Sequence, residues 1–265
     1  ENRALSFSGD SGNYLEIPDR PEFRFENGDS ITLEAWVRPD RGDDNHVYLI
    51  GKGRTYSRLP DAENQNWALR LSQDDGSAGV SFLFRSRDTP EDEGEYHRWT
   101  SDASLLTGGD WHHVAFRYTF GKPDSAVAFI DGEASDGKWD LGGATERPPV
   151  ADADPVWVGT SRGAKESNSY NGAIDRIRVF REALSDDVLA ERYRAVVVPP
   201  RLAPTETPRD EVRVTVTSVG QPERWPRQIP EADESFSIER FTLFDLPPTY
   251  GAHASREDRE PPVLL

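Results

Sequence analysis

The chain has 265 residues and carries 48 acidic against 31 basic side chains, which gives a formal net charge of −17 at pH 7. A charge of this sign repels nucleic-acid phosphates and anionic membrane surfaces, so it argues against a nucleic-acid partner. No apolar run approaches the length of a membrane span, so membrane insertion is not expected. Cysteine is absent, which excludes disulfides, thiolate metal sites and cysteine nucleophiles.

Short strands are predicted through the first 160 residues. Residues 31–37 alternate between apolar side chains on one face and Thr32, Glu34 and Trp36 on the other. Similar short apolar runs occupy 67–71, 80–84, 113–118, 126–130 and 155–159. Turn-forming clusters separate these runs, and Asp131-Gly132 is a pair that favours a two-residue hairpin turn. This rhythm predicts an all-β fold, a two-sheet antiparallel sandwich.

One helix is predicted after the last strand of this region. Residues 172–181 indicate a turn followed by a half-buried strand. Ser185 then offers an N-cap, and Asp186 and Asp187 place carboxylates in the first turn. The helix is expected to reach about Tyr193.

Composition changes beyond this helix, which suggests a domain boundary. We expect one domain over 1–197, a proline-rich linker over 198–210 and a C-terminal extension over 211–265 that contains β-strands. Two strands cannot bury a core alone, so the extension either docks on the sandwich, which we favour, or begins a truncated further domain. Methionine is absent, so we expect the chain to be a processed or excised piece of a longer protein.

The order of segments resembles laminin-G-like, concanavalin A-like jelly-roll domains. The matching segments cover about residues 3–194 and are 4–10, 13–17, 31–39, 110–116, 129–132, 156–159 and 172–185. The surroundings of 142–150 and the tail over 256–262 are similar to large exported planctomycete-type bacterial proteins. In those proteins such a module accompanies other domains.

The resemblance implies a jelly roll that recognises a ligand without catalysis, often with one calcium ion at its rim. It predicts a recognition module of a secreted, periplasmic or cell-surface protein, with carbohydrate as the leading ligand. A structural or protein–protein interaction module, whose partners are neighbouring domains of a larger chain, is the first alternative. A glycoside hydrolase or polysaccharide lyase on the same fold is the second.

Calcium, if bound, needs hard oxygen ligands from carboxylates, amides and backbone carbonyls. Asp10 and Asn13 lie in a glycine-containing turn between the first strands, and Asp175 shares the parity of the apolar Ile177 and Val179. An inward carboxylate requires a cation or backbone donors. The resemblance places the rim calcium of the family near these positions, so Asp10, Asn13 and Asp175 are the predicted ligands. Capping of a turn by Asp175 is the alternative.

Aromatic side chains outside the core are the candidates for stacking on a sugar ring. Trp36, Trp67 and Trp111 fall within strand patterns and are expected in the core. Trp157 points away from its two valine neighbours, and the remaining candidates are expected in loops. The predicted ligand-binding residues are therefore Trp99, Trp139, Trp157, Tyr170 and Tyr56.

Two catalytic patterns were tested against the chain. Residues 159–163 fit Gly-x-Ser-x-Gly, but a polar loop follows instead of a helix, and the only later histidine is His253. The carboxylates of 91–95 and 231–234 come near a glycosidase pair, but flanking prolines place both in loops. We therefore predict that the chain is not an enzyme.

Overall fold

A computed structural model describes residues 4–10, 12–40, 42, 46–53, 65–89, 94–161 and 166–197, and three short strands beyond them. The strands up to residue 197 are β1 (Leu5–Ser8), β2 (Leu15–Ile17), β3 (Ser30–Pro39), β4 (His46–Gly53), β5 (Gln65–Asp74), β6 (Ser77–Ser86), β7 (Glu95–Leu106), β8 (His112–Thr119), β9 (Lys122–Ile130), β10 (Glu133–Ser135), β11 (Gly137–Leu141), β12 (Val156–Val158) and β13 (Asn171–Phe180). The helical segments are the 3-10 turns η1 (Pro21–Phe23) and η2 (Glu166–Asn168) and the helix α1 (Asp186–Val197). The later strands are β14 (Val212–Val214), β15 (Thr217–Ser218) and β16 (Phe236–Ile238).

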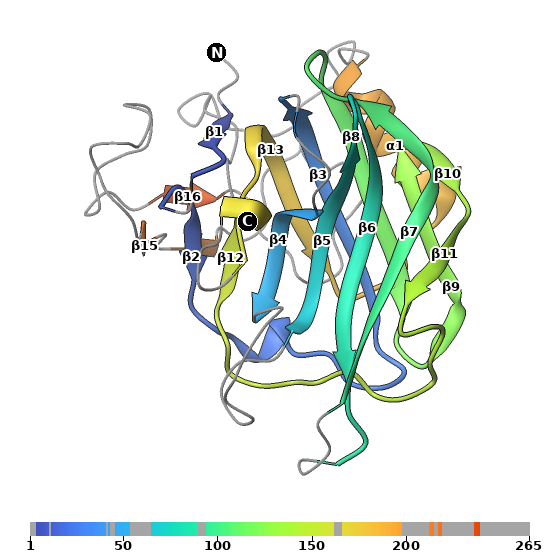
Figure 1. Cartoon of the computed structure of the whole chain (residues 1–265). Coiled ribbons are helices and arrows are strands. Elements are labelled where there is room, and N and C mark those ends of the chain that lie inside the picture. Colours follow the sequence, from blue (N-terminus) through green and yellow to red (C-terminus); the bar gives the residue numbers. More distant parts are fainter. Residues whose placement is uncertain are drawn as a thin grey trace, which may run out of the picture.

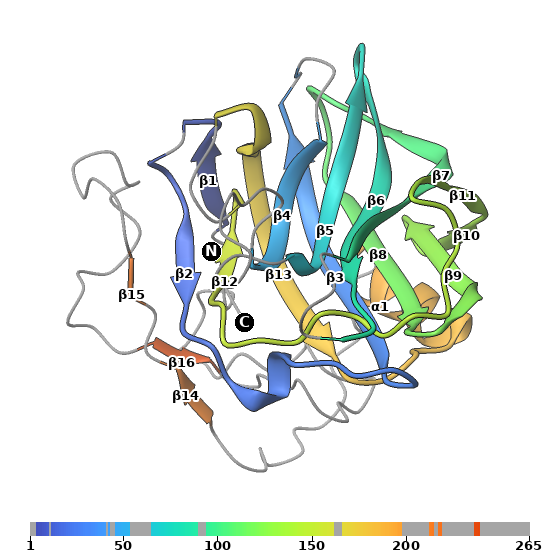
Figure 2. The same ribbon diagram turned by 60° about the horizontal axis from the view of Figure 1, so that its bottom comes forward.

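The strands form two antiparallel sheets that pack face to face (Figure 1). Sheet A has the order β1-β13-β3-β8-β9-β10, and sheet B has the order β11-β7-β6-β5-β4-β12-β2-β15. Figure 2 shows the two layers from below, with α1 on the side of sheet A. This arrangement confirms the predicted two-sheet antiparallel jelly roll with one short helix.

The core lies between the sheets, where the inward side chains of each strand meet. Phe82 of β6 stacks on Phe116 of β8 with ring centroids 4.5 Å apart, and Trp99 of β7 lies 5.2 Å from the same Phe116 ring. These rings bridge sheet B and sheet A. Because aromatic side chains bury large apolar areas, these contacts contribute strongly to the packing of one sheet on the other.

Helix α1 covers the outer face of sheet A. Leu189 of α1 is fully buried against a cluster that includes Phe129 and Phe180. The Ser185 carbonyl accepts from the Leu189 amide at 3.1 Å, as the start of a helix requires. The predicted helix is confirmed, although it continues four residues past Tyr193 to Val197.

A buried carboxylate anchors the helix to the sheet. Glu34 of β3 accepts from Arg178 Nη1 at 2.5 Å and from Arg192 Nε and Nη2 at 2.5 and 3.0 Å. His113 Nε2 lies 3.8 Å from the same carboxylate, and all four side chains are at most 4% exposed. Burial favours the neutral acid, but Arg192 and Arg178 hold the pKa of Glu34 well below its ordinary value. The two arginines therefore keep this carboxylate ionised under the helix.

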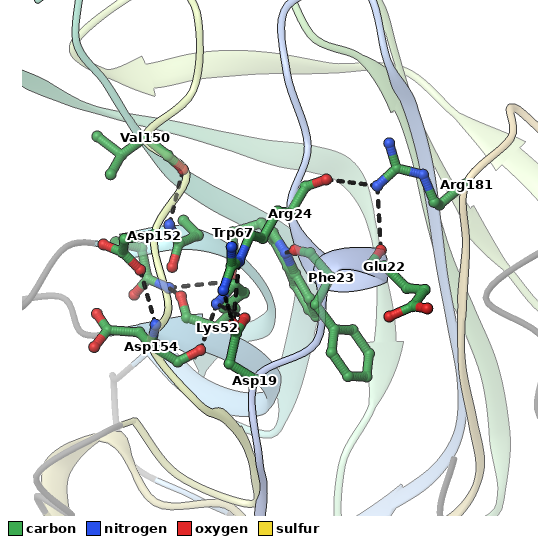
Figure 3. Close-up of polar contacts among 12 residues, drawn as sticks. Asp19, Glu22, Phe23, Arg24, Lys52, Trp67, Val150, Asp152, Asp154 and Arg181 are labelled. Atoms are coloured by element: carbon green, nitrogen blue, oxygen red, sulfur yellow. Dashed lines mark hydrogen bonds and ion pairs between the residues drawn. The ribbon is translucent and has the colours of Figure 1, made fainter.

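A second buried ion pair fixes the segment before β12 (Figure 3). Lys52 is fully buried and donates to Asp19 Oδ1 at 2.6 Å and to the Asp154 carbonyl. Arg24 pairs with the same Asp19 carboxylate. Burial lowers the pKa of Lys52, and Arg24 and Lys52 lower the pKa of Asp19 against the effect of burial. The buried ammonium is thus neutralised by a carboxylate that has a second cation beside it.

Two smaller expectations concern a turn and the extension. Asp131 and Gly132 both have positive φ, 53° and 80°, and join β9 to β10 as the predicted two-residue hairpin.

In the extension, β15 pairs with β2 at the edge of sheet B. The division at 197 and 210 remains a prediction. No helix in the described residues is long and apolar enough to cross a membrane.

Candidate functional site: the outer face of sheet B

The face of sheet B that points away from the core carries polar, aromatic and cationic side chains. The strand register aligns Tyr48 of β4, Arg70 of β5 and Ser81 of β6 in one row. The next row holds Ala68, Leu83 and Arg98. Arg70 points outward because its neighbours Leu69 and Leu71 lie in the core, and side chains alternate along a strand.

Two arginine–tyrosine contacts mark the middle of this face. The Arg70 guanidinium lies 5.5 Å from the Tyr48 ring centroid, and the Arg85 guanidinium lies 5.2 Å from that of Tyr96. Tyr48 also packs with Ala68 and Leu83, and Tyr96 borders the same apolar group. A guanidinium over an aromatic face is an attractive and well-defined arrangement. We call Tyr48, Ala68, Arg70, Leu83, Arg85, Tyr96 and Arg98 the outer-face cluster.

The edge of the outer-face cluster holds one carboxylate and one histidine. Asp140 Oδ1 accepts from Arg98 Nε at 2.6 Å, and Asp140 Oδ2 accepts from Thr100 Oγ1 at 3.2 Å. Burial, with Arg70 and Arg98 nearby, lowers the pKa of His46 from its ordinary 6.5 to about 4. His46 is therefore neutral at pH 7, in surroundings where the positive field dominates.

Two of the predicted stacking aromatics prove to be core residues. Trp99 was expected in a loop, but it lies within β7, is 3% exposed and contacts Phe116 across the sandwich. Tyr170 is fully buried, and its hydroxyl donates to the Ala173 carbonyl at 3.1 Å. The expectation that these two rings are open to a sugar is wrong, because the core already covers them.

The other aromatic candidates have mixed placements. Trp139 lies in β11 rather than in a loop and packs against the core, with its Nε1 donating to the Pro123 carbonyl at 3.3 Å. Trp157 of β12 points away from the core, as expected, and stacks on Tyr14 at 4.2 Å between centroids. Tyr56 lies outside the described residues. Trp157 is the predicted aromatic that reaches the outer face of sheet B.

The predicted orientation of Asp175 is wrong because β13 contains a bulge. Asp175 pairs with Trp36, and Arg178 pairs with Glu34. The two residues between them on β13 therefore lie opposite the single residue between their partners on β3, and the first of the two, Arg176, has φ 53°. The extra residue reverses the side-chain alternation, and Asp175 faces the helix side of sheet A with Trp36. Burial raises the pKa of Asp175 to about 6, while Arg176, 3.6 Å away, acts in the opposite direction.

The three predicted calcium ligands do not form one group. Asp10 follows β1, whose last residue Ser8 pairs with Asn171 of β13. Asp175 lies four residues after Asn171, so the rise of a strand separates these two positions on β13 by about 13 Å. Asn13 is 4% exposed, and its backbone N–H donates to the Asp10 carbonyl oxygen at 3.2 Å. Within the described ranges, no three acidic or histidine side chains are arranged to hold a metal ion. Calcium binding stays a prediction.

One buried pair has the geometry of a serine nucleophile and its base. Ser86 Oγ and His97 Nε2 are 2.8 Å apart, and His97 Nδ1 is 2.9 Å from the Gly143 carbonyl oxygen. Both side chains are essentially unexposed, and His97 packs on Phe84. The pair is therefore a core hydrogen bond. Of the glycosidase-like carboxylates, Glu95 is exposed at the start of β7, and 91–93 and 231–234 lie outside the described residues.

Sequence reasoning did not find the outer-face cluster. Its signal was present, since Arg70 and Arg98 each stand between inward-facing residues of a strand. A prediction based on aromatic residues in loops does not include arginines on strands.

The comparisons with known proteins agree with this architecture. Residues 8–190 match the sequence family described as the concanavalin A-like lectin/glucanases superfamily. The chain belongs to that superfamily. No curated protein matches the chain.

Several solved structures are similar to this chain at low sequence identity. The binding domain of Paraclostridial Mosquitocidal Protein 1 is 13% identical, with a TM-score of 0.52, and the match covers 74% of this chain and 44% of that one. The Ruminococcus gnavus IT-sialidase CBM40 bound to α2,3 sialyllactose is 16% identical, with a TM-score of 0.43 over 71% and 95% of the two chains. Mouse laminin α1 domains LG4-5 are 19% identical, with a TM-score of 0.44 over 69% and 43%.

Proposed function

We propose that this chain is a non-catalytic carbohydrate-recognition module of an exported protein, and that it binds its ligand on the outer face of sheet B. The observation that carries the proposal is the partly exposed part of the outer-face cluster, Arg85 of β6 with Tyr96 and Arg98 of β7. The other four cluster residues are buried and support this part from below. Aromatic and guanidinium planes lie together on strands of a rigid sandwich. Sugars are bound by such combinations of apolar faces and fixed polar donors.

The asymmetry between the two sheets supports this location. The outer face of sheet A is occupied by α1, through Leu189 and through the Glu34 ion pairs. On sheet B, the 3-10 turn η2 lies beside β4, where Ser169 pairs with Tyr48, and the partly exposed side chains of the cluster are those of β6 and β7. Trp157 and Tyr14 add a stacked aromatic pair on β12 and beside β2 of the same sheet.

A saccharide array with single-residue variants tests the proposal. We expect the full chain to bind at least one glycan saturably and expect Tyr96→Ala and Trp157→Ala to weaken that binding. Trp111→Ala is the matched control, because Trp111 lies next to β8 of sheet A and contacts Arg38 there. If all three variants bind as the unaltered protein does, the site is elsewhere.

If no glycan binds and neighbouring domains co-purify with the chain, a protein-interaction module replaces this proposal. Shortening of a polysaccharide by the pure protein would instead establish an enzyme.

A further inference from the structure

The margin of sheet B between β7 and β11 is accessible at its outer face. Leu141 of β11 pairs with Arg98 of β7 and is 44% exposed. Residues 142–144 continue the chain past Leu141 and are exposed as well, and Tyr96, on the same face of β7 as Arg98, is partly exposed. We call Tyr96, Arg98 and Thr100 of β7, with residues 140–144, the β7–β11 margin. A ligand can reach this margin, in contrast to the buried cluster residues of β4 and β5.

An ion pair at the surface of the β7–β11 margin has hydrogen-bonding groups to spare. Asp140 stands where the register of β11 shifts, and such a bulge turns a side chain towards a new direction. Asp140 Oδ1 accepts from Arg98 Nε at 2.6 Å, and its Oδ2 accepts from Thr100 Oγ1 at 3.2 Å. The Arg98 and Asp140 side chains are 24% and 23% exposed. In the described part of the chain, Nε is the one Arg98 nitrogen that donates to protein.

The charges of this pair favour a neutral ligand over an acidic one. Asp140 compensates the charge of Arg98, so the pair presents donors and acceptors side by side without a net charge. An acidic group that approached the guanidinium would also approach the carboxylate, and the repulsion would offset the attraction.

Sugar hydroxyls match the hydrogen-bonding groups of the pair. A guanidinium only donates and a carboxylate only accepts, whereas a hydroxyl does both. Two adjacent ring hydroxyls can therefore accept from the remaining Arg98 N–H groups and donate to Asp140. The exposed Leu141 side chain beside the pair offers an apolar surface to the carbon atoms of a sugar ring.

We propose that the β7–β11 margin binds a neutral saccharide, with Arg98 and Asp140 holding two adjacent hydroxyls of one ring. Leu141 and Tyr96 contact the same ring from its apolar side. The inference rests on the proposed carbohydrate function, and it adds the chemical class of the ligand and the residues that select it.

Binding is measured by titration calorimetry on the full chain with matched pairs of saccharides. Cello-oligosaccharide is compared with its form carboxylated at C6, methyl-esterified oligogalacturonate with oligogalacturonate, and lactose with sialyllactose. We expect a neutral member to bind about tenfold more tightly than its acidic counterpart. Asp140→Asn should weaken the neutral member about tenfold and tighten the acidic one, because Arg98 then lacks its counter-charge. Arg98→Gln should weaken the neutral member without creating affinity for the acidic one.

An ion pair of the same type on the other side of the sandwich supplies the matched control. Arg117 Nη1 lies 2.7 Å from Asp186 Oδ1, where α1 begins on sheet A. Asp186→Asn should leave the affinities for both members of each pair unchanged. Exposed ion pairs contribute little to stability, so all three variants should remain folded at the temperature of the titration, which their melting curves check.

A neutral preference that Asp140→Asn reduces or inverts, and that Asp186→Asn leaves intact, supports the inference. Tighter binding of an acidic member to the unaltered protein overturns it and leaves carbohydrate recognition standing. A neutral preference that survives both Asp140→Asn and Arg98→Gln overturns it as well, because the ligand then lies elsewhere. Absence of saccharide binding overturns both the inference and the proposed function.

Discussion

Replacement of Glu34 by glutamine is expected to destabilise the sandwich by about 3 to 5 kcal/mol, because Arg178 and Arg192 would keep buried charges without a carboxylate. For a domain of this size, each kcal/mol lowers Tm by about 2 to 4 °C, so Tm should fall by roughly 6 to 20 °C. The exposed Glu191→Gln on α1 is the matched control and should change stability by less than about 0.5 kcal/mol.

The measurement is urea unfolding followed by tryptophan fluorescence at pH 7. Glu34→Gln should lower the midpoint without changing the slope, since the surface exposed on unfolding stays the same. Joint replacement of Glu34, Arg178 and Arg192 by methionine should recover most of the loss, because no buried charge is then left alone. A cost below about 1 kcal/mol for Glu34→Gln would refute the reasoning, as would a triple variant less stable than the single one.

The pH dependence of the same protein follows from the low pKa of Glu34. A carboxyl whose pKa is lower in the folded than in the unfolded state stabilises the fold above its unfolded pKa. This stabilisation disappears as the pH falls below about 4.5 towards the folded value. The Glu34→Gln variant should therefore lose less stability than the unaltered protein between pH 5 and pH 3.

Three further predictions concern other charged residues. Asp19→Asn should destabilise the protein to urea more than Lys52→Met does. The first variant leaves the buried Lys52 ammonium without a carboxylate, whereas in the second variant Asp19 still pairs with Arg24. The reverse order would contradict the assigned pairing. Asp175 has a folded pKa of about 6 against an ordinary 3.8, so the folded state binds the extra proton between these values, and this residue lowers stability as the pH rises from about 4 to 6. Asp175→Asn should remove that slope and stabilise the protein above pH 6 by at most about 3 kcal/mol, and a stability profile identical to that of the unaltered protein would contradict it. If calcium binds near Asp10, a chelator should lower the Tm of the unaltered protein. The decrease should be smaller in Asp10→Ala and equally large in Asp175→Ala. A melting curve that a chelator does not change would exclude a stabilising calcium site.

The alternation of apolar residues was enough to predict the sheets and the helix, but it failed at irregular positions. In β13 the single extra residue at the bulge, with Arg176 at φ 53°, reverses the direction of every side chain before it relative to those after it. No apolar pattern announces such an insertion, because Asp175 and Arg176 are both polar. Asp175 was therefore assigned to the wrong face.

Trp99 shows a second limit. The strand β7 has the sequence Glu95-Tyr-His-Arg-Trp-Thr-Ser-Asp-Ala-Ser-Leu-Leu106, and its inward positions include His97 as well as Trp99. A strand with a polar outer face and a histidine inside resembles a loop when only apolar residues are counted. The outward orientation of Arg70 could have been predicted from Leu69 and Leu71. Its contacts with Tyr48 of β4 and Ser81 of β6 could not, because they depend on how neighbouring strands align.

Mapping of the binding surface by NMR tests the central claim most directly. The full chain, labelled with ¹⁵N, is titrated with the glycan that binds most tightly. We predict that the amide shifts concentrate on β6 and β7 around Arg85, Tyr96 and Arg98, with α1 unaffected. Shifts confined to α1 and sheet A, or to the turn around Asp10, would contradict the account.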